Sequence, residues 1–368
     1  MRISGLEIIH LRLPLVSPFE TSFGAVRETE TLLVRAEAEG REGWGECPAS
    51  AAPSYSSETV HTARYIITEF LAPLLRDADI ASPADLPALF RRIRGHNMAK
   101  GGVEMALWDL TAKIKNVSLS RLIGGSRSEI PTGVSIGIQP TPDDLLRTIE
   151  GALAKGYRRI KLKIKPGWDT AILETVRRRF GAIPLMADAN AAYTLEQTDH
   201  LMQLDRFDLM MLEQPLDEDD IVDHRLLQEK MKTPLCLDES IKSPEDGRRA
   251  LDLGSCRIVN IKQARVGGTS RAIRLHDLCR DRGVPVWCGG LLESGVGRLH
   301  NIALASLENF TLPGDISASE RYYQEDIVDP PVRLTDRGTI LVPDGAGIGA
   351  TIRVDMVERY CVGRSDVL

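Results

Sequence analysis

Hydrophobic and polar positions follow different periods in different parts of this chain. Residues 1–50 alternate between apolar and polar, as antiparallel strands do, with a hairpin turn expected at Glu39–Gly43. Residues 57–115 space their apolar positions three and four apart, which predicts helices. From residue 131 to about 320, short apolar runs alternate with helical segments, so repeated βα units are expected. The pattern therefore predicts an α+β region followed by an α/β region.

Five charged residues mark the ends of successive strand-like runs in the α/β region. They follow one another at intervals of 25, 25, 25 and 24 residues, and they are Lys163, Asp188, Glu213, Asp238 and Lys262. One strand, one helix and two short loops fill such an interval, which is typical of a closed parallel barrel. The predicted fold class is therefore α/β, a TIM-like (β/α) barrel with an N-terminal α+β capping domain. Chemistry in such barrels lies at the C-terminal strand ends, where these five residues are expected to meet.

The predicted domains follow from the same change of period. We expect a capping domain with substrate-covering loops at residues 1–125, the catalytic barrel at 126–320, and a C-terminal segment at 321–368 that packs back on the capping domain. The first boundary is placed at the paired glycines Gly124–Gly125, because a new strand follows them.

Eight strands are expected to close the barrel. The first is predicted at residues 131–138 and is followed by a helix over 142–155. The seventh and eighth strands are predicted at 285–291 and 310–317.

Two loops of the capping domain carry aromatic residues. Residues 17–24 contain Phe19 and Phe23, and residues 48–55 end in Tyr55. These side chains are either satellite contacts of the core or a hydrophobic lid, because loops on rigid scaffolds often close sites against water. The lid interpretation makes all three substrate-binding residues.

Composition and charge argue against several classes of protein. A net charge of −6 disfavours nucleic acid and acidic membranes as partners, and the chain contains neither a basic-then-apolar leader nor an apolar run of 18 residues. The six scattered cysteines form no CxxC pair, which favours a reduced, cytoplasmic protein. A homo-oligomer that acts on a small-molecule carboxylate is expected.

The three carboxylates of the series predict a metal site. Asp188, Glu213 and Asp238 are expected to converge from adjacent strands, where they would repel one another unless a cation neutralised them. An all-oxygen ligand set selects a hard ion such as Mg²⁺ or Mn²⁺. Asn190 shares the face of Asp188 and Glu239 follows Asp238, so both are expected to support the site. The alternative, that each acid caps the following helix, does not explain the equal spacing.

The lysines predict proton transfer. Lys161 and Lys163 point to the same side of their strand, and the cationic neighbour disfavours the charged form of Lys163, which suits a general base. Lys262 is expected to approach the substrate from the opposite face. A divalent ion on a carboxylate acidifies the adjacent C–H by stabilising the enolate, so the two lysines can remove and return a proton.

A glycine-rich stretch at residues 289–298 lacks the spacing of a nucleotide-binding loop. Its glycines are expected to let the backbone approach a ligand, with Gly290 and Leu291 lining the substrate site. Glu293 is either a local polar anchor or a further residue of the site, and both alternatives stay open.

The layout resembles the enolase superfamily, in its muconate-lactonising branch. That branch carries Lys-x-Lys on the second barrel strand, metal-binding carboxylates on the third to fifth, and a lysine on the sixth. Essentially the whole chain takes part, and several stretches resemble the o-succinylbenzoate synthase/N-succinylamino acid racemase family. They include PFETSFG, RIKLKIKPGWD, DANAAYTL, EQPLDEDD, CLDESI, VWCGGLLESGVGR and FTLPGDISAS.

This resemblance implies an enzyme, a lyase or an isomerase, in which Mg²⁺ or a similar ion binds the substrate carboxylate and the lysines act around the α-carbon. It implies dehydration of 2-succinyl-6-hydroxy-2,4-cyclohexadiene-1-carboxylate in menaquinone biosynthesis, racemisation of N-succinylamino acids, or both. Ser135 and Arg265 match further pocket positions of the family. One departure is Gln263, where the family usually has proline after the sixth-strand lysine.

Related activities are alternatives. A muconate cycloisomerase is the second candidate, and acid-sugar or dipeptide epimerases of the superfamily are further ones. Dipeptide epimerases carry Asp-x-Asp on the eighth strand, but this chain has Asp315-Ile-Ser317, and the seventh-strand histidine of mandelate-type racemases is missing from residues 285–291. A non-catalytic barrel would be expected to lack at least one of the five charged residues.

Overall fold

The computed structural model describes residues 1–22 and 24–368. Phe23, one of the three predicted lid residues, lies outside them. The N-terminal part forms an antiparallel sheet of strands β1 (Gly5–Thr21), β2 (Gly24–Ala38) and β3 (Arg41–Cys47). The predicted hairpin turn lies at Glu39 and Gly40, which both have positive φ (53° and 69°).

Helices pack against one face of this sheet. They are α1 (Val60–Ile66), the π-helix η1 (Ile67–Leu71), α2 (Ala72–Arg76), the 3₁₀ turn η2 (Pro83–Asp85), α3 (Leu86–Leu89), α4 (Asn97–Ile114) and α5 (Leu119–Leu122). Helix α4 lies directly on β3 because two glycines admit its backbone. A Cβ on Gly43 would lie 2.3 Å from the carbonyl oxygen of Ala106, and one on Gly45 would lie 2.2 Å from that of Gly102. This close contact fixes the capping domain as an α+β unit.

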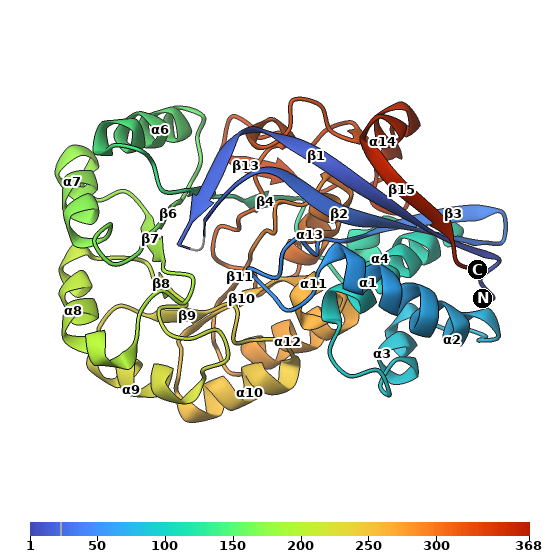
Figure 1. Cartoon of the computed structure of the whole chain (residues 1–368), viewed down its shortest axis with the longest axis horizontal. Helices are drawn as coiled ribbons and strands as arrows, with labels where there is room; N and C mark the ends of the chain where they lie inside the picture. Colours follow the sequence, from blue (N-terminus) through green and yellow to red (C-terminus); the bar gives the residue numbers. More distant parts are fainter. Residues whose placement is uncertain (23) are drawn as a thin grey trace.

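A parallel sheet forms the second part, and Figure 1 shows it curled with helices along its outer side. In the described part of the chain it has seven strands in sequential order. They are β5 (Val134–Ile136), β6 (Ile160–Lys163), β7 (Leu185–Asp188), β8 (Leu212–Glu213), β9 (Leu235–Leu237), β10 (Ile258–Ile261) and β11 (Val286–Cys288). The predicted TIM-like barrel with an N-terminal capping domain is confirmed.

The segment predicted as the eighth strand, residues 310–317, is not a regular strand. It still lies between the first and last strands, because Asp315 N–H donates to Cys288 O on β11 (2.8 Å) and Gly133 N–H donates to Gly314 O (2.7 Å). An isolated bridge joins Thr132 to Gly314. The ring therefore closes through a few backbone hydrogen bonds of an irregular segment.

Helices of the barrel alternate with its strands. They are α6 (Pro142–Ala154), α7 (Thr170–Phe180), η3 (Leu195–Gln197), α8 (Thr198–Met202), η4 (Gln203–Phe207), α9 (Val222–Lys230), α10 (Pro244–Leu253), α11 (Gln263–Val266), α12 (Thr269–Asp281) and α13 (Gly295–Ala305). Helix α6 begins at Thr141, whose hydroxyl accepts the backbone N–H of Asp144. The predicted helix over 142–155 is thus confirmed within one residue.

The loop predicted at residues 17–24 is instead the tip of the β1–β2 hairpin, where Phe19 pairs with Val26 and Thr21 with Gly24. A register shift between Pro14 and Phe19 interrupts the apolar alternation, which explains why the sequence indicated a loop. The tip reaches the barrel, since Ile138 N–H donates to Glu20 O (2.9 Å). Figure 1 shows the hairpin extending over the strand ends.

The C-terminal residues return to the capping sheet. Strand β15 (Cys361–Asp366) pairs antiparallel with β1 and extends the sheet at that edge. Both chain termini lie close together at this end of the molecule (Figure 1). The remaining elements are β4 (Glu129–Pro131), η5 (Ser319–Arg321), β12 (Val328–Asp329), β13 (Thr339–Leu341), β14 (Thr351–Ile352) and α14 (Val354–Tyr360). No helix in the described ranges is long and apolar enough to cross a membrane.

Candidate active site

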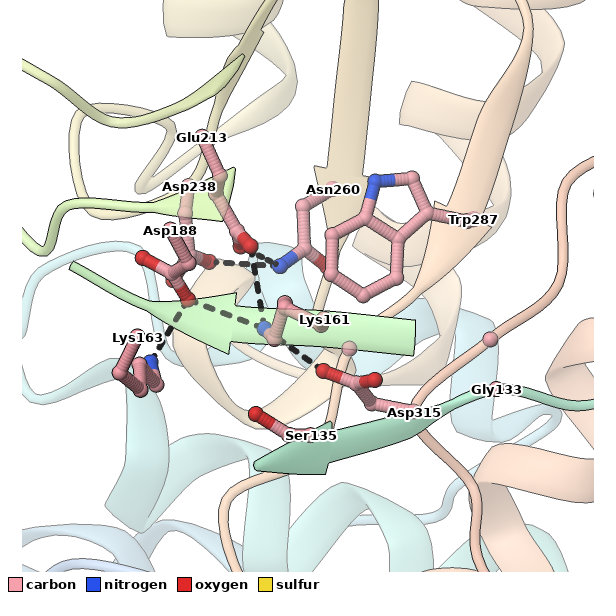
Figure 2. Close-up of polar contacts among 12 residues, drawn as sticks. Gly133, Ser135, Lys161, Lys163, Asp188, Glu213, Asp238, Asn260, Trp287 and Asp315 are labelled. Carbon is pink, nitrogen blue, oxygen red and sulfur yellow. Dashed lines mark hydrogen bonds and ion pairs between the residues drawn. The ribbon is translucent and has the colours of Figure 1, made fainter. Parts of the chain in front are cut away.

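The five charged residues of the 25-residue series lie together at the C-terminal ends of the barrel strands. Register pairs Lys163 with Asp188 and Asp188 with Glu213, while Asp238 and Lys262 directly follow β9 and β10. The three carboxylates are at most 1% exposed. Such deep burial of charge requires close counterions, and Figure 2 shows how the lysines supply them.

Lys161 is the central cation of the cluster. Its ammonium lies 3.0 Å from Asp188 Oδ2, 3.0 Å from Glu213 Oε2 and 2.6 Å from Asp315 Oδ2. It also lies 4.9 Å from the centre of the Trp287 ring. Burial by itself would lower the pKa of Lys161, but Asp315, Glu213 and Asp188 together raise it. Lys161 is therefore a permanent positive charge at the base of the site.

Lys163 has a different electrostatic environment. Its ammonium donates to Asp188 Oδ2 and to Asn190 Oδ1, both at 2.6 Å. Burial lowers the pKa of Lys163, Asp188 opposes that shift, and Lys161 adds to it, so the net direction is downward. A lysine that loses its proton more readily than usual is suited to act as a general base.

Asn190 links Lys163 to the next carboxylate. Its Nδ2 donates to Glu239 Oε1 (2.8 Å), and the other oxygen of Glu239 is buried with no hydrogen-bond partner among the described residues. Burial and the charge of Asp188 raise the pKa of Glu239. Both predicted supporting residues thus lie beside the lysine.

Lys262 lies between Asp238 and an aromatic ring. Its ammonium is 2.8 Å from Asp238 Oδ2, donates to the Tyr55 hydroxyl at 3.0 Å, and lies 4.4 Å from the Tyr55 ring centre. Burial alone would lower the pKa of Lys262, but the neighbouring oxygens, that of Tyr55 first, raise it. A Cβ on Gly289 would lie 2.6 Å from Lys262 Cε. The glycine at this strand end therefore makes room for the lysine.

Asp238 is the most heavily used carboxylate. Besides Lys262, it accepts hydrogen bonds from the Tyr55 hydroxyl (3.2 Å), from Asn260 Nδ2 (3.1 Å) and from the guanidinium of Arg265. Arg265 is 4% exposed and also donates to the carbonyl oxygen of Ile241 (2.8 Å). The predicted residue Arg265 thus reaches the site through a carboxylate.

The three carboxylates supply only oxygen atoms, which are the donors that a hard divalent cation prefers. In the two described ranges, no three acidic, histidine or cysteine side chains meet in a group that could hold a metal ion as they are placed. The reason lies in their partners: Lys161 takes oxygens of Asp188 and Glu213, and Arg265 takes one of Asp238. The donor chemistry fits a divalent metal, provided that these ion pairs loosen.

A cavity of about 60 Å³ opens between the two strand-end lysines. Among the predicted residues, it is lined by Phe19, Ser135, Lys161, Lys163, Lys262, Gly290 and Glu293. The hydroxyl of Ser135 is buried and has no partner among the described residues. Ligand pockets are usually several times larger, so side chains above this cavity must move for a substrate to enter.

Three predicted residues do not line this cavity. Tyr55 and Arg265 act through Lys262 and Asp238, whereas Leu291 packs against the core of the capping domain and its neighbour Leu292 lines the cavity instead. A larger cavity, about 970 Å³, lies between the end of α6 and the C-terminal segment. We place the site in the smaller cavity because the buried lysines and carboxylates are there.

Two residues of the site were not predicted. Asn260 donates to Glu213 Oε1 (2.7 Å) as well as to Asp238, and Asp315 pairs with Lys161 and with Arg159 Nη1 (2.7 Å). Asn260 precedes Lys262 by two positions, so the period of a strand could have placed it on the same face. Asp315 lies in the irregular eighth segment, and its sequence offered no comparable signal.

Comparison with known proteins agrees with this geometry. Residues 4–124 match the mandelate racemase/muconate lactonizing enzyme N-terminal domain, and residues 144–356 match the enolase C-terminal domain-like family. The chain is 56% identical to an o-succinylbenzoate synthase of Geobacillus kaustophilus over 98% of this chain and 96% of that protein. The chain belongs to the o-succinylbenzoate synthase/N-succinylamino acid racemase family of the enolase superfamily.

Two further relatives support this membership. An N-succinylamino acid racemase of an Amycolatopsis species is 47% identical over 99% of each chain. The crystal structure of an enolase superfamily member from Listeria innocua superposes with a TM-score of 0.96 at 43% identity, covering 100% of this chain and 99% of that one. Enzymes of the superfamily depend on a divalent metal. The predicted family and its enzymatic nature are therefore confirmed.

Proposed function

We propose that this protein removes the proton α to a carboxylate through an enolate. It thereby dehydrates 2-succinyl-6-hydroxy-2,4-cyclohexadiene-1-carboxylate to o-succinylbenzoate, racemises N-succinylamino acids, or does both. One observation carries the proposal: two buried lysines with opposite pKa shifts, Lys163 and Lys262, line one cavity beside three buried carboxylates.

The pKa shifts assign different duties to the lysines. Lys163, whose pKa is lowered, takes the α-proton and can return it to the departing hydroxyl as water leaves. Lys262, whose pKa is raised, carries a positive charge that stabilises the enolate. In racemisation, Lys262 protonates the face of the α-carbon opposite to Lys163. Both reactions thus use the same residues.

We further propose that Asp188, Glu213 and Asp238 hold one Mg²⁺ or Mn²⁺. When bound, such an ion takes a substrate carboxylate oxygen and makes the adjacent C–H more acidic. Lys161 neutralises the excess of negative charge around the ligands, through Asp188, Glu213 and Asp315. Asn260 orients two of the ligands by donating to Glu213 and Asp238.

The alternative of a dipeptide epimerase finds less support. A substrate ammonium would need free carboxylates near the eighth segment, but Asp315 already pairs with Lys161 and Arg159. The next polar residue on that side is Ser317, which is neutral. A muconate cycloisomerase remains the second candidate activity, because it uses the same constellation of lysines and carboxylates.

Assays of the purified protein with Mg²⁺ test the proposal. We expect o-succinylbenzoate to form from the cyclohexadiene acid, or N-succinyl-L-phenylalanine to lose its optical rotation, at a rate at least about 10⁴-fold above the buffer rate. A muconate substrate should turn over much more slowly. Turnover of muconate alone would replace this proposal by the second candidate.

The lid gives a separate prediction. Phe19 lines the cavity and packs edge-on against Tyr322, with ring centres 6.1 Å apart. If it covers the substrate, Phe19→Ala should raise KM by roughly tenfold, since burying an aromatic side chain contributes about 1–3 kcal/mol. The melting temperature should change little. A large loss of thermal stability at unchanged KM would instead make Phe19 a core residue.

A further inference from the structure

Gln263 begins the short helix α11 directly after Lys262, and its side chain is buried at 2% exposure. Its Nε2 donates to Asn301 Oδ1 (2.8 Å), and its Oε1 accepts from the Thr269 hydroxyl (2.9 Å). Both ends of the amide are therefore satisfied by side chains from helices that follow later in the chain. A buried amide with two partners is held in one position.

The hydrogen bonds continue into the active-site cavity. Asn301, on α13, donates through Nδ2 to Glu293 Oε1 (2.9 Å), and the backbone N–H of Leu291 donates to Glu293 Oε2 (2.8 Å). Asn301 and Glu293 both line the cavity that contains Lys163 and Lys262. The series thus joins the residue next to Lys262 to the loop between β11 and α13.

The direction of this series is determined by its last member. An ionised Glu293 can only accept, so Asn301 must present its NH₂ group to Glu293 and its oxygen to Gln263. Gln263 must then donate, which leaves its own oxygen for Thr269. No amide in the series can turn over without breaking two bonds, so the series defines a single geometry for the loop.

The opposite wall of the loop contacts Lys262 itself. A Cβ on Gly289 would lie 2.6 Å from Lys262 Cε, and one on Gly290 would lie 3.4 Å from Glu293 Oε2. The β11–α13 loop therefore touches both the stem of the lysine and the end of the hydrogen-bonded series. A displacement of the loop would change the space available to Lys262, whereas Lys163 is held separately by Asp188 and Asn190.

We propose that Gln263 is a positioning residue that acts through Asn301 and Glu293 to hold the β11–α13 loop against Lys262. It thereby supports proton transfer on the Lys262 face of the substrate and not on the Lys163 face. This inference rests on the proposed function, because it needs an α-proton that either lysine can exchange. Proline at this position has no side-chain donor, so the link is a feature of this chain.

The test is α-proton exchange in D₂O, followed by ¹H NMR separately for N-succinyl-D- and N-succinyl-L-phenylalanine. The enantiomer that still exchanges in Lys163→Ala is the one whose proton faces Lys262. Gln263→Met and Gln263→Pro should both slow exchange of that enantiomer by on the order of tenfold. Exchange of the other enantiomer should change less than about twofold.

Thr269→Val is the matched control, because it removes the other hydrogen bond of the Gln263 amide and keeps the link to Asn301. Its ratio of exchange rates should equal that of the wild type. Asn301→Ala should reproduce the Gln263 effect, and combining it with Gln263→Met should add nothing further. Equal slowing of both enantiomers, or no slowing, overturns the positioning role. Failure of the wild type to exchange either enantiomer would instead contradict the proposed function.

Discussion

Replacing Lys163 by alanine is expected to abolish dehydration and racemisation, with a loss of about 10²–10⁴-fold or more in kcat. The reason is that Lys163 is the buried lysine whose pKa is lowered, and a syn dehydration can proceed from one face with a single acid–base group. Lys262→Ala should impair both reactions too, because the enolate then loses the ammonium whose pKa is raised by Tyr55 and the nearby carboxylates.

The two variants differ in D₂O. Lys262→Ala should exchange the α-proton of only one enantiomer of an N-succinylamino acid, the one whose proton faces Lys163. Equal exchange of both enantiomers would mean that the lysines do not flank the α-carbon, and the two-base mechanism would have to be abandoned.

The pH dependence gives a second readout for the same lysine. Only the neutral form of Lys163 accepts a proton, so exchange in Lys262→Ala should rise with pH and level off above the pKa of Lys163. That pKa is lowered from the ordinary value of 10.5, and the rise should therefore be centred below pH 10.5. A midpoint at or above pH 10.5 would contradict the assignment of Lys163 as the base.

Replacing Asp238 by asparagine should reduce turnover by at least about 10²-fold, because a metal ligand is lost and metal-ion catalysis contributes several kcal/mol. EDTA should abolish wild-type turnover, and added Mg²⁺ or Mn²⁺ should restore it. Binding of Mn²⁺ can be followed by electron paramagnetic resonance without any turnover. Asp238→Asn should weaken that binding strongly.

Asp315→Asn is the matched control for the metal site. Asp315 is also a buried carboxylate beside Lys161, and Arg159 and Lys161 overcome the effect of burial to lower its pKa to about 2, yet it is not a proposed ligand. It should retain Mn²⁺ binding while losing some activity. Wild-type activity that survives thorough chelation, or equal loss of Mn²⁺ binding in both variants, would exclude Asp238 as a specific ligand.

The sequence by itself was sufficient for the barrel and for its charged residues. Strand and helix lengths set the interval near 25 residues, and parallel strands bring residues at equal intervals to the same edge. The positions of Lys163, Asp188 and Glu213 therefore followed from spacing alone, and the register of β6, β7 and β8 agrees with it. Side-chain alternation likewise placed Lys161 beside Lys163.

Tertiary structure decided what pairs with these residues. Tyr55 meets Asp238 across 183 positions of sequence, and Gln263 meets Asn301 across 38, because the packing of loops and helices brings them together. No local period encodes such contacts. The same holds for Asp315, whose irregular segment closes the barrel through backbone hydrogen bonds to neighbouring strands. Spacing therefore specified which charges gather, whereas packing determined which lysine has its pKa lowered and which has it raised.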